Sequence, residues 1–151
     1  MDAASEECAR EGYAGANVNT ISKAAGFAKG TIYNYFPSKR ALMLALIDDV
    51  AAAHLDFVVT QVQAEGEPVR RLQSFFEAGF AFVSIHLARA RMMVNTIYGP
   101  ELEFKTYMYR AYQPMFQFVS TEIVGVGITQ GVFRQVDPDA TAALLMTIYL
   151  G

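Results

Sequence analysis

The chain has 151 residues, 53% of them hydrophobic and 13% aromatic, with a formal net charge of −3 at pH 7 and a sequence pI near 5.3. This composition supports a packed core and excludes a disordered chain. One cysteine excludes an internal disulfide framework, and the acidic pI excludes a nucleic-acid binder that is basic over its whole surface. Because neither a signal-peptide pattern nor an apolar run of about 20 residues is present, we expect a cytoplasmic protein.

The first two helices are expected at residues 1–11 and 17–25. The first begins without a capping residue, so we expect it to start inside a longer helix. Asn17 is a favourable N-cap for the second, and Gly26 can end it in the left-handed conformation. The tight turn that follows is expected to carry Phe27 into the core.

A short helix at residues 29–36 is expected next, because Ile32 and Phe36 recur at helical spacing and can share one buried face. The other side chains of this segment would remain on the surface. Pro37 ends the segment, and Ser38 caps the helix that follows. These elements together predict a helix-turn-helix followed by the start of a long helix.

The charges in this region favour an anionic partner. Between Glu11 and Asp48 there is no acidic residue, whereas the same stretch holds four cations and therefore a local charge of +4. These cations are Lys23, Lys29, Lys39 and Arg40. Lys39 and Arg40 fall in the first turn of the helix after Ser38, where the helix dipole opposes a positive charge.

Apolar periodicity predicts five further helices, at residues 38–64, 69–87, 88–98, 101–131 and 137–151. The helix over 69–87 is apolar nearly all round, so it should lie at the centre of a second domain. Pro114 should kink or split the helix over 101–131, and Gly131 should end it. Because no segment shows β alternation, the sequence predicts an all-α protein.

The stretch AAGFAKGTIYNYFPSKRALMLAL, residues 24–46, and the preceding signature Cys8-Ala9-Arg10-Glu11-Gly12-Tyr13 closely resemble the helix-turn-helix of the tetracycline-repressor (TetR) family of transcription regulators. The resemblance covers residues 3–47. It implies an N-terminal three-helix, homeodomain-like helix-turn-helix domain at residues 1–47. It also implies a C-terminal helical bundle for effector binding and dimerisation at residues 48–151. Relative to the family, the chain is expected to lack the N-terminal arm and the C-terminal helix.

Two positions depart from the family pattern. Ala28 stands where the family usually has serine, so the recognition helix should lack a side-chain cap at a cost of roughly 1 kcal/mol. Cys8 replaces the usual phenylalanine and leaves a smaller side chain between the first helix and the other two. Because Cys8 has no histidine or second thiol beside it in the sequence, we expect a buried structural thiol.

The residues expected at the DNA interface are polar, cationic or small. Hydroxyl, amide and ammonium groups can bond phosphate oxygens, and Gly30 lets the backbone approach a phosphate. The amide of Asn34 could pair with adenine, and the methyl group of Thr31 could touch thymine. The expected set is Asn17, Lys29, Gly30, Thr31, Tyr33, Asn34, Tyr35 and Lys39. From the residues alone, a solvated face on a small three-helix domain is an equal alternative.

Aromatic and methionine side chains are abundant in the second half of the chain. Most should be ordinary core, but adaptable methionines and polar-tipped tyrosines also suit an apolar cavity with a few hydrogen-bonding groups. In the resembled family the middle helices form a cavity of this kind for an inducer. By this resemblance the ligand-binding candidates are Phe76, Phe80, Met93, Ile97, Tyr98, Phe104, Tyr107, Met108 and Tyr112.

The remaining titratable residues give weaker signals. His86 is expected on the central helix, where a lone histidine is more often a core or surface group than a ligand contact. His54 is expected to be solvated or at a helix contact. Arg89, Arg91 and Arg110 could meet an anionic ligand, but surface ion pairs with Glu101 and Glu103 are favoured. Because the sequence has neither metal-ligand spacing nor a nucleophile–base pair, we expect no metal, no cofactor and no enzymatic activity.

The leading hypothesis is a dimeric, ligand-responsive regulator, a repressor by family resemblance. Its two heads, which are the helix-turn-helix domains of the two copies, would enter successive major grooves of a palindromic operator, about 34–36 Å apart. A small, largely apolar or aromatic effector would tilt the helix over 38–64 and change the separation of the heads. No membrane partner is expected. One alternative is a helical adaptor without operator recognition, supported by the missing cap at Ala28, and another is a small enzyme that uses the aromatic pocket.

Overall fold

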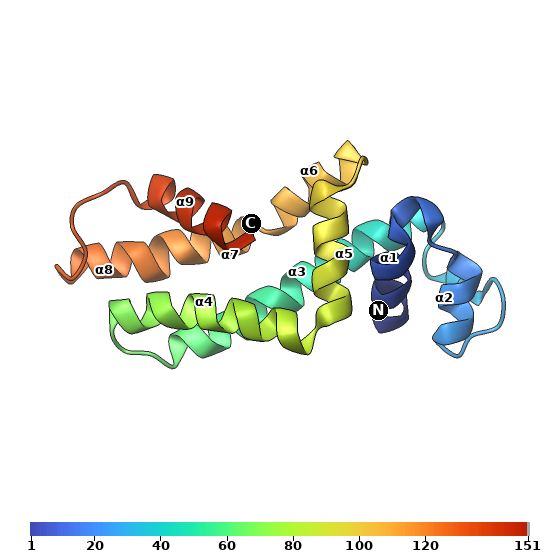
Figure 1. Cartoon of the computed structure of the whole chain (residues 1–151), viewed down its shortest axis with the longest axis horizontal. Helices are drawn as coiled ribbons and strands as arrows, with labels where there is room; N and C mark the ends of the chain where they lie inside the picture. The colour runs from blue at the N-terminus through green and yellow to red at the C-terminus, as the bar shows by residue number, and fades with distance from the viewer. Residues whose placement is uncertain (151) are drawn as a thin grey trace. The chain divides into compact units, whose positions relative to one another are not determined.

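The computed structural model describes residues 1–150, and all regular structure in that range is helical (Figure 1). The elements are α1 (Asp2–Gly15), α2 (Val18–Ala24), the 3₁₀ turn η1 (Thr31–Asn34), α3 (Lys39–Gln63), α4 (Pro68–Ile85), α5 (Leu87–Tyr98), α6 (Leu102–Ala111), α7 (Gln113–Phe118), the π-helical segment η2 (Val119–Gly125), α8 (Val126–Thr129) and α9 (Pro138–Leu150). The predicted all-α class is confirmed. No helix in the described part of the chain is long and apolar enough to cross a membrane.

The helices group into two compact units. Residues 1–52 and 85–111 form the first unit, and residues 53–84 and those from 112 onward form the second. Helix α3 contributes its first half to one unit and its second half to the other. Helices α5 and α6 thus pack with the amino-terminal helices, and α1 lies along α5. The functional boundary after Ile47 stays a prediction.

Several helix ends lie where the sequence predicts them. The side chain of Asn17 accepts a hydrogen bond from the Asn19 N–H at 2.9 Å and so caps α2. Gly26 then adopts φ +80° at the end of that helix. Ser38 caps α3 through a 3.0 Å bond from the Ala41 N–H.

The predicted helix over residues 29–36 is wrong, because only Thr31–Asn34 are helical, and they form a single 3₁₀ turn. Gly30 precedes the turn with φ +83° and provides no capping side chain. Pro37 limits the other end, because it disfavours helical geometry at the residue before it. Ile32 is buried as predicted, whereas Phe27 is 45% exposed and does not enter the core.

The central helix α4 ends earlier than predicted. His86 has the non-helical angles φ −117° and ψ 51° and separates α4 from α5, so it does not lie on the central helix. The Ser84 hydroxyl donates to the Phe80 carbonyl at 2.9 Å, a back-bond that tends to bend helices near their ends. Helix α4 also leaves one side open, with Phe80 73% and Val83 45% exposed, so its expected burial all round is wrong.

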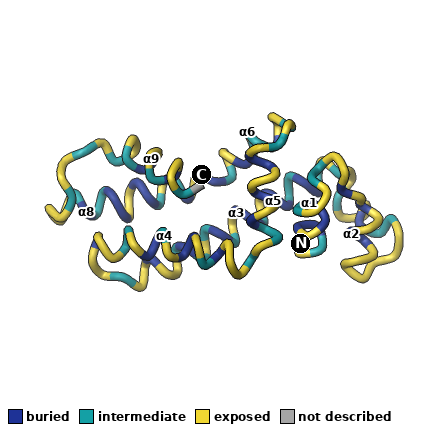
Figure 2. The backbone as a smooth tube through the Cα atoms, in the orientation of Figure 1, coloured by how far each residue is buried: buried dark blue, intermediate teal, exposed yellow. Residues whose placement is uncertain are grey.

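Each unit has its own apolar core (Figure 2). In the first unit the core residues from the middle of α3 meet those of α5 and α6. They include Leu46, Ile47, Val50, Met92, Phe104 and Met108. In the second unit the end of α3 contributes with α4, α7 and η2, through Val58, Val62, Phe75, Phe82, Met115, Val119 and Ile123. The predicted break at Pro114 is confirmed, since α6 ends at Ala111 and Pro114 lies in the first turn of α7.

Candidate nucleic-acid interface

The connection between α2 and η1 is held by hydrogen bonds that converge on one carbonyl. The Ala28 carbonyl accepts the Ser22 hydroxyl at 2.8 Å and the Thr31 N–H at 3.1 Å. Gly30 follows in the left-handed conformation, and a Cβ atom built on it would meet nothing within 4 Å. The backbone at Gly30 is therefore open to a large approaching group.

The turn around η1 brings most of the predicted interface residues together on the surface. Tyr33 is 46% and Tyr35 68% exposed, and Lys29 and Asn34 are exposed as well. Thr31 is partly covered. This short segment thus presents an ammonium group, an amide and two phenol hydroxyls on the surface. Such groups can donate hydrogen bonds to phosphate or base edges.

Two members of the predicted set have partners inside the protein. Asn17 uses its side chain as the cap of α2, and its backbone N–H donates to the buried Glu7 carboxylate at 3.0 Å. Lys39 donates from Nζ to the Ala14 carbonyl at 2.9 Å and lies 4.9 Å from the centre of the Tyr13 ring. These contacts fix the entry to α2 and to α3. Whether either residue also touches DNA stays a prediction.

The ion pairs of the first unit differ from those expected. Arg40 pairs with Glu103, which raises the pKa of the Arg40 guanidinium. Arg89 lies within 3.1 Å of an Asp2 oxygen and 3.2 Å of an Asp49 oxygen. The expected pairing of Arg89 with Glu101 or Glu103 is therefore wrong. Of the four cations of the predicted patch, Lys23, Lys29 and Arg40 are exposed and Lys39 is partly covered, and Arg40 is paired with Glu103.

The ligand-binding candidates of the first unit lie on α5 and α6. Met93, Ile97, Phe104 and Met108 are buried, and Tyr98 is 63% exposed. The Tyr107 hydroxyl donates to Asp48 at 2.8 Å, and this bond raises the pKa of Tyr107. The three candidates of the second unit differ in burial, from the buried Tyr112 through the half-buried Phe76 to the exposed Phe80. Their part in ligand binding stays a prediction.

His54 is buried in the second unit, where only 2% of it is exposed. Its ring stacks on Phe82 with centroids 4.1 Å apart and planes 13° apart. Nδ1 lies 2.9 Å from the Tyr112 hydroxyl, and Nε2 lies 2.6 Å from the Tyr149 hydroxyl. The solvated alternative is therefore wrong and the helix contact is confirmed. Steps of four residues from Val50 through His54 to Val58 on α3 could have shown it.

The hydrogen bonds of His54 place polar atoms inside an aromatic surrounding. A neutral imidazole has one donor and one acceptor, so one tyrosine hydroxyl donates to the ring and the other accepts from it. Burial raises the pKa of both Tyr112 and Tyr149, which keeps the two phenols protonated. We call His54, Phe82, Tyr112 and Tyr149 the histidine cluster.

Surface grooves lie in both units. One of about 480 Å³ is bounded by the start of α1, the end of α2 and η1, and its rim includes Phe27 and Tyr35. Another of about 630 Å³ lies between η2, α8 and the start of α9, and Asp137 and Asp139 are at its edge. Among residues 1–150, no group of three or more His, Cys, Asp or Glu side chains could hold a metal ion.

Known proteins resemble this chain both in sequence and in fold. Residues 1–46 match a family described as "Bacterial regulatory proteins, tetR family". The A-factor receptor protein of Streptomyces griseus is 27% identical over 156 residues, an alignment covering 100% of this chain and 51% of that protein. The HTH-type transcriptional repressor KstR2 of Mycobacterium tuberculosis is 25% identical over 148 residues, covering 89% of this chain and 67% of KstR2.

The fold has solved counterparts. The transcriptional regulator FadR from Bacillus subtilis, solved in complex with stearoyl-CoA, superposes with a TM-score of 0.87 at 21% identity, over 98% of this chain and 80% of FadR. The chain spans about half the length of the A-factor receptor protein and about two thirds of KstR2. The matched amino-terminal residues coincide with α1, α2, η1 and the start of α3, and the shared fold extends over both units. Residues 1–46 therefore match the tetR family of bacterial regulatory proteins, and the rest of the chain shares the fold of FadR.

Proposed function

We propose that the chain forms the DNA-binding and effector-binding part of a transcriptional repressor that works in the cytoplasm. The repressor binds a palindromic operator as a homodimer and is released by a small, largely apolar or aromatic effector. The observation that carries this proposal is the exposed turn around η1. There Lys29, Tyr33, Asn34 and Tyr35 surround an open glycine at position 30, within a segment that matches the tetR family.

The chemistry of this turn suits a DNA groove. The Lys29 ammonium can neutralise a phosphate, and the open backbone at Gly30 admits one without a steric clash. The Asn34 amide can pair with an adenine edge in the major groove, and the Thr31 methyl group can contact thymine. Lys29 and the tyrosine hydroxyls would set position, whereas Asn34 and Thr31 would set sequence.

The effector is proposed to be apolar from the composition of the candidate side chains and from a similar protein. FadR of Bacillus subtilis, which shares this fold, was solved with stearoyl-CoA. Met93, Ile97, Phe104 and Met108 supply apolar, partly adaptable surface. Acyl-CoA thioesters are therefore the first compounds to test, beside aromatic molecules of similar size.

The homodimer is supported by helix α9. Leu144 is 67% and Ile148 72% exposed on one face of this helix, and Asp139 is its one charged residue. Exposed apolar side chains one turn apart favour a helix–helix contact with a second copy. Changing Leu144 and Ile148 to glutamate should convert the dimer to monomer in sedimentation analysis. A dimer that persists unchanged would contradict the use of this face.

Release by the effector requires two states of the protein. The effector must bind the state that is incompetent for DNA more tightly, typically by about 1–3 kcal/mol of coupling free energy. Helix α3 links the two processes in our proposal, because it begins at Lys39 close after the DNA-facing turn, and its Asp48 accepts a hydrogen bond from Tyr107, one of the effector candidates.

The test is fluorescence anisotropy of the full-length protein with DNA from its own upstream region, measured across salt concentrations. Replacement of Lys29 and Tyr33 by alanine should weaken binding and reduce the salt dependence, by a slope of about 0.9 for each lost phosphate contact. The matched control replaces Lys105 and Tyr109 on α6, which removes the same kinds of group elsewhere in the unit. Weak binding of the wild type, unaffected by either pair of changes, would contradict operator binding and favour the adaptor.

A further inference from the structure

Helix α1 is interrupted at Gly12, which has φ 65° and ψ 178°. This combination lies in a region of backbone space that essentially only glycine occupies. After Gly12 the chain forms one more short helical turn. This turn is closed by a 3.0 Å hydrogen bond from the Ala16 N–H to the Gly12 carbonyl. The interruption is therefore a fixed joint in the backbone and not a frayed helix end.

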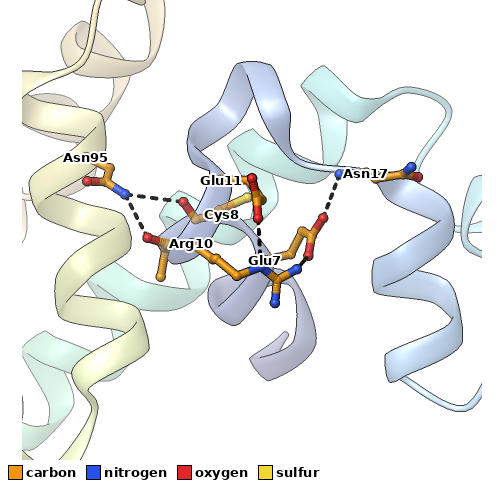
Figure 3. Close-up of polar contacts among 7 residues, drawn as sticks. Glu7, Cys8, Arg10, Glu11, Asn17 and Asn95 are labelled. Atoms are coloured by element: carbon orange, nitrogen blue, oxygen red, sulfur yellow. Dashed lines mark hydrogen bonds and ion pairs between the residues drawn. The ribbon is translucent and has the colours of Figure 1, made fainter.

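A break of this kind leaves the carbonyls of the preceding turn without their usual donors. The Asn95 side chain of α5 donates from Nδ2 to the Ala9 carbonyl at 3.1 Å and to the Cys8 carbonyl at 3.4 Å (Figure 3). An amide N–H also carries partial positive charge, which suits the negative end of a helix. Asn95 therefore acts as a C-terminal cap that is supplied by another helix.

The segment after Gly12 in turn positions the elements that carry the proposed DNA interface. The Tyr13 ring packs on Phe104 with centroids 4.4 Å apart, and Nζ of Lys39 lies over the Tyr13 ring, 4.9 Å from its centroid. The Ala14 carbonyl accepts the Lys39 ammonium, which belongs to the first turn of α3. On the other side of the joint the Glu7 carboxylate accepts the N–H of Asn17, the cap of α2 (Figure 3).

We propose that Asn95 is a positioning residue for the DNA-binding turn, because it holds the joint at Gly12 and so fixes α1 relative to α2 and the start of α3. The inference deepens the proposed function and rests on it. Through Asn95, helix α5 is hydrogen-bonded directly to α1. A displacement of α5 would remove the donor from the Cys8 and Ala9 carbonyls and release the segment from Gly12 to Ala16.

The first test is hydrogen–deuterium exchange of the full chain without DNA. Asn95→Leu, which removes the donor, should speed exchange of the amides from Tyr13 to Asn17 by about five- to tenfold, the factor expected for one lost hydrogen bond. Asn95→Asp should do at least as much, because a carboxylate repels the two carbonyls. The control Gln61→Leu changes an exposed amide on α3 in the second unit and should leave these amides unchanged. Unchanged exchange in both Asn95 variants would overturn the proposal.

The second test uses the same variants in DNA anisotropy. Asn95→Leu should weaken binding while the slope of affinity against salt stays at the wild-type value, because no phosphate contact is removed. Gly12→Ala should act in the same direction, since alanine is strained at φ +65° although its Cβ would meet nothing within 4 Å. Faster exchange together with unchanged DNA affinity would show a purely structural role and overturn the proposal.

The two tests keep the failure of this inference apart from the failure of the proposed function. If the wild type does not bind DNA, the proposed function fails, and the exchange measurement still decides whether Asn95 holds the joint. If the Asn95 variants fail to fold, Gly12→Ala tests the joint from its other side. Gly12→Ala that leaves both exchange and DNA affinity unchanged would overturn the proposal.

Discussion

The contacts that link helices within the first unit differ from those within the second. In the first unit, partly exposed polar groups link the helices. Arg40 and Glu103 join α3 to α6, Arg89 and Asp2 join α5 to α1, and the Asn95 amide caps the break in α1. Most of these groups remain in contact with water, so water can replace each partner when a helix moves.

In the second unit the helices meet through buried rings. His54 of α3 stacks on Phe82 of α4, and its two nitrogens engage the hydroxyls of Tyr112 and Tyr149. The Tyr149 ring of α9 also stacks on Phe75 with centroids 4.4 Å apart. Water cannot replace these contacts without opening a cavity in a close-packed interior. The polar contacts of the first unit are therefore easier to exchange for water than the ring contacts of the second, although the first unit also has a buried apolar core.

The largest expected effect comes from opening that aromatic core. Phe82→Ala removes a ring that is 1% exposed and should lower the free energy of unfolding by about 3–5 kcal/mol, as measured by urea denaturation. The exposed Phe80 on the same helix gives the matched control, and Phe80→Ala should have a much smaller effect. Equal losses for the two variants would show that the ring contacts of Phe82 do not hold the unit together.

The next effect tests how closely α4 and α9 approach. A Cβ atom at Gly79 would lie 2.1 Å from Cε2 of Tyr149, so Gly79→Ala must displace a ring that is held by His54 and Phe75. Such overpacking should cost about 1–3 kcal/mol in thermal or urea unfolding. Gly66→Ala is the control, because its added Cβ would meet nothing within 4 Å. A neutral Gly79→Ala would mean that Tyr149 can leave this position freely.

Sequence reasoning succeeded where a local signal determines the structure. Asn17, Ser38 and Gly26 end or begin helices through their own side chains or backbone freedom, so their positions follow from residue type. Cys8, which has no histidine or second thiol beside it in the sequence, is expected to be buried. This expectation is confirmed, since Cys8 is 6% exposed. The helix-turn-helix motif itself is also local, which is why the family could be identified from residues 3–47.

Sequence reasoning failed where contacts distant in the chain decide the outcome. His54 is polar, so its burial depends on hydroxyls supplied 58 and 95 residues later. Glu103 meets Arg40 across 63 residues, a pairing that no spacing rule within α6 could indicate. The joint at Gly12 shows the same limit, because Asn95 lies 86 residues from the Ala9 carbonyl that it caps. Periodicity reports which face of a helix is apolar and not which helix will meet it.

Alkaline pH should weaken both units, beginning at a lower pH in the first unit than in the second. Burial raises the pKa of the Cys8 thiol in the first unit from 9.0 to about 11. It also raises the pKa of Tyr112 and Tyr149 in the second unit above the ordinary value of about 10. A raised pKa means that the folded state holds the proton more tightly, so stability is full below the unfolded pKa and falls as pH rises.

The free energy of unfolding should therefore fall from about pH 9 to 11 through Cys8, and further above about pH 10 through the tyrosines. Cys8→Ala should remove the first part of the fall, and the change of Tyr112 and Tyr149 to phenylalanine should remove the second. Urea denaturation at each pH gives both slopes. If the variants fall as steeply as the wild type, the alkaline loss arises from other groups.

The smallest effect is expected from the ion pair between Arg40 and Glu103. Both side chains are at least half exposed, so water and salt screen their attraction and holding them together costs side-chain entropy. A double-mutant cycle with Arg40→Ala and Glu103→Ala should give a coupling free energy near the limit of measurement. Any coupling should vanish at about 1 M salt, where charges are screened within about 3 Å.

The same cycle also distinguishes stability from function. Because Arg40 lies in the first turn of α3, its release from Glu103 would return a cation to the DNA-facing side of the first unit. Glu103→Ala should therefore leave unfolding almost unchanged yet raise DNA affinity and steepen its dependence on salt. Glu103→Ala that left both quantities at the wild-type values would show that Arg40 does not face the DNA, and the interface would then rest on the other three cations of the patch, Lys23, Lys29 and Lys39.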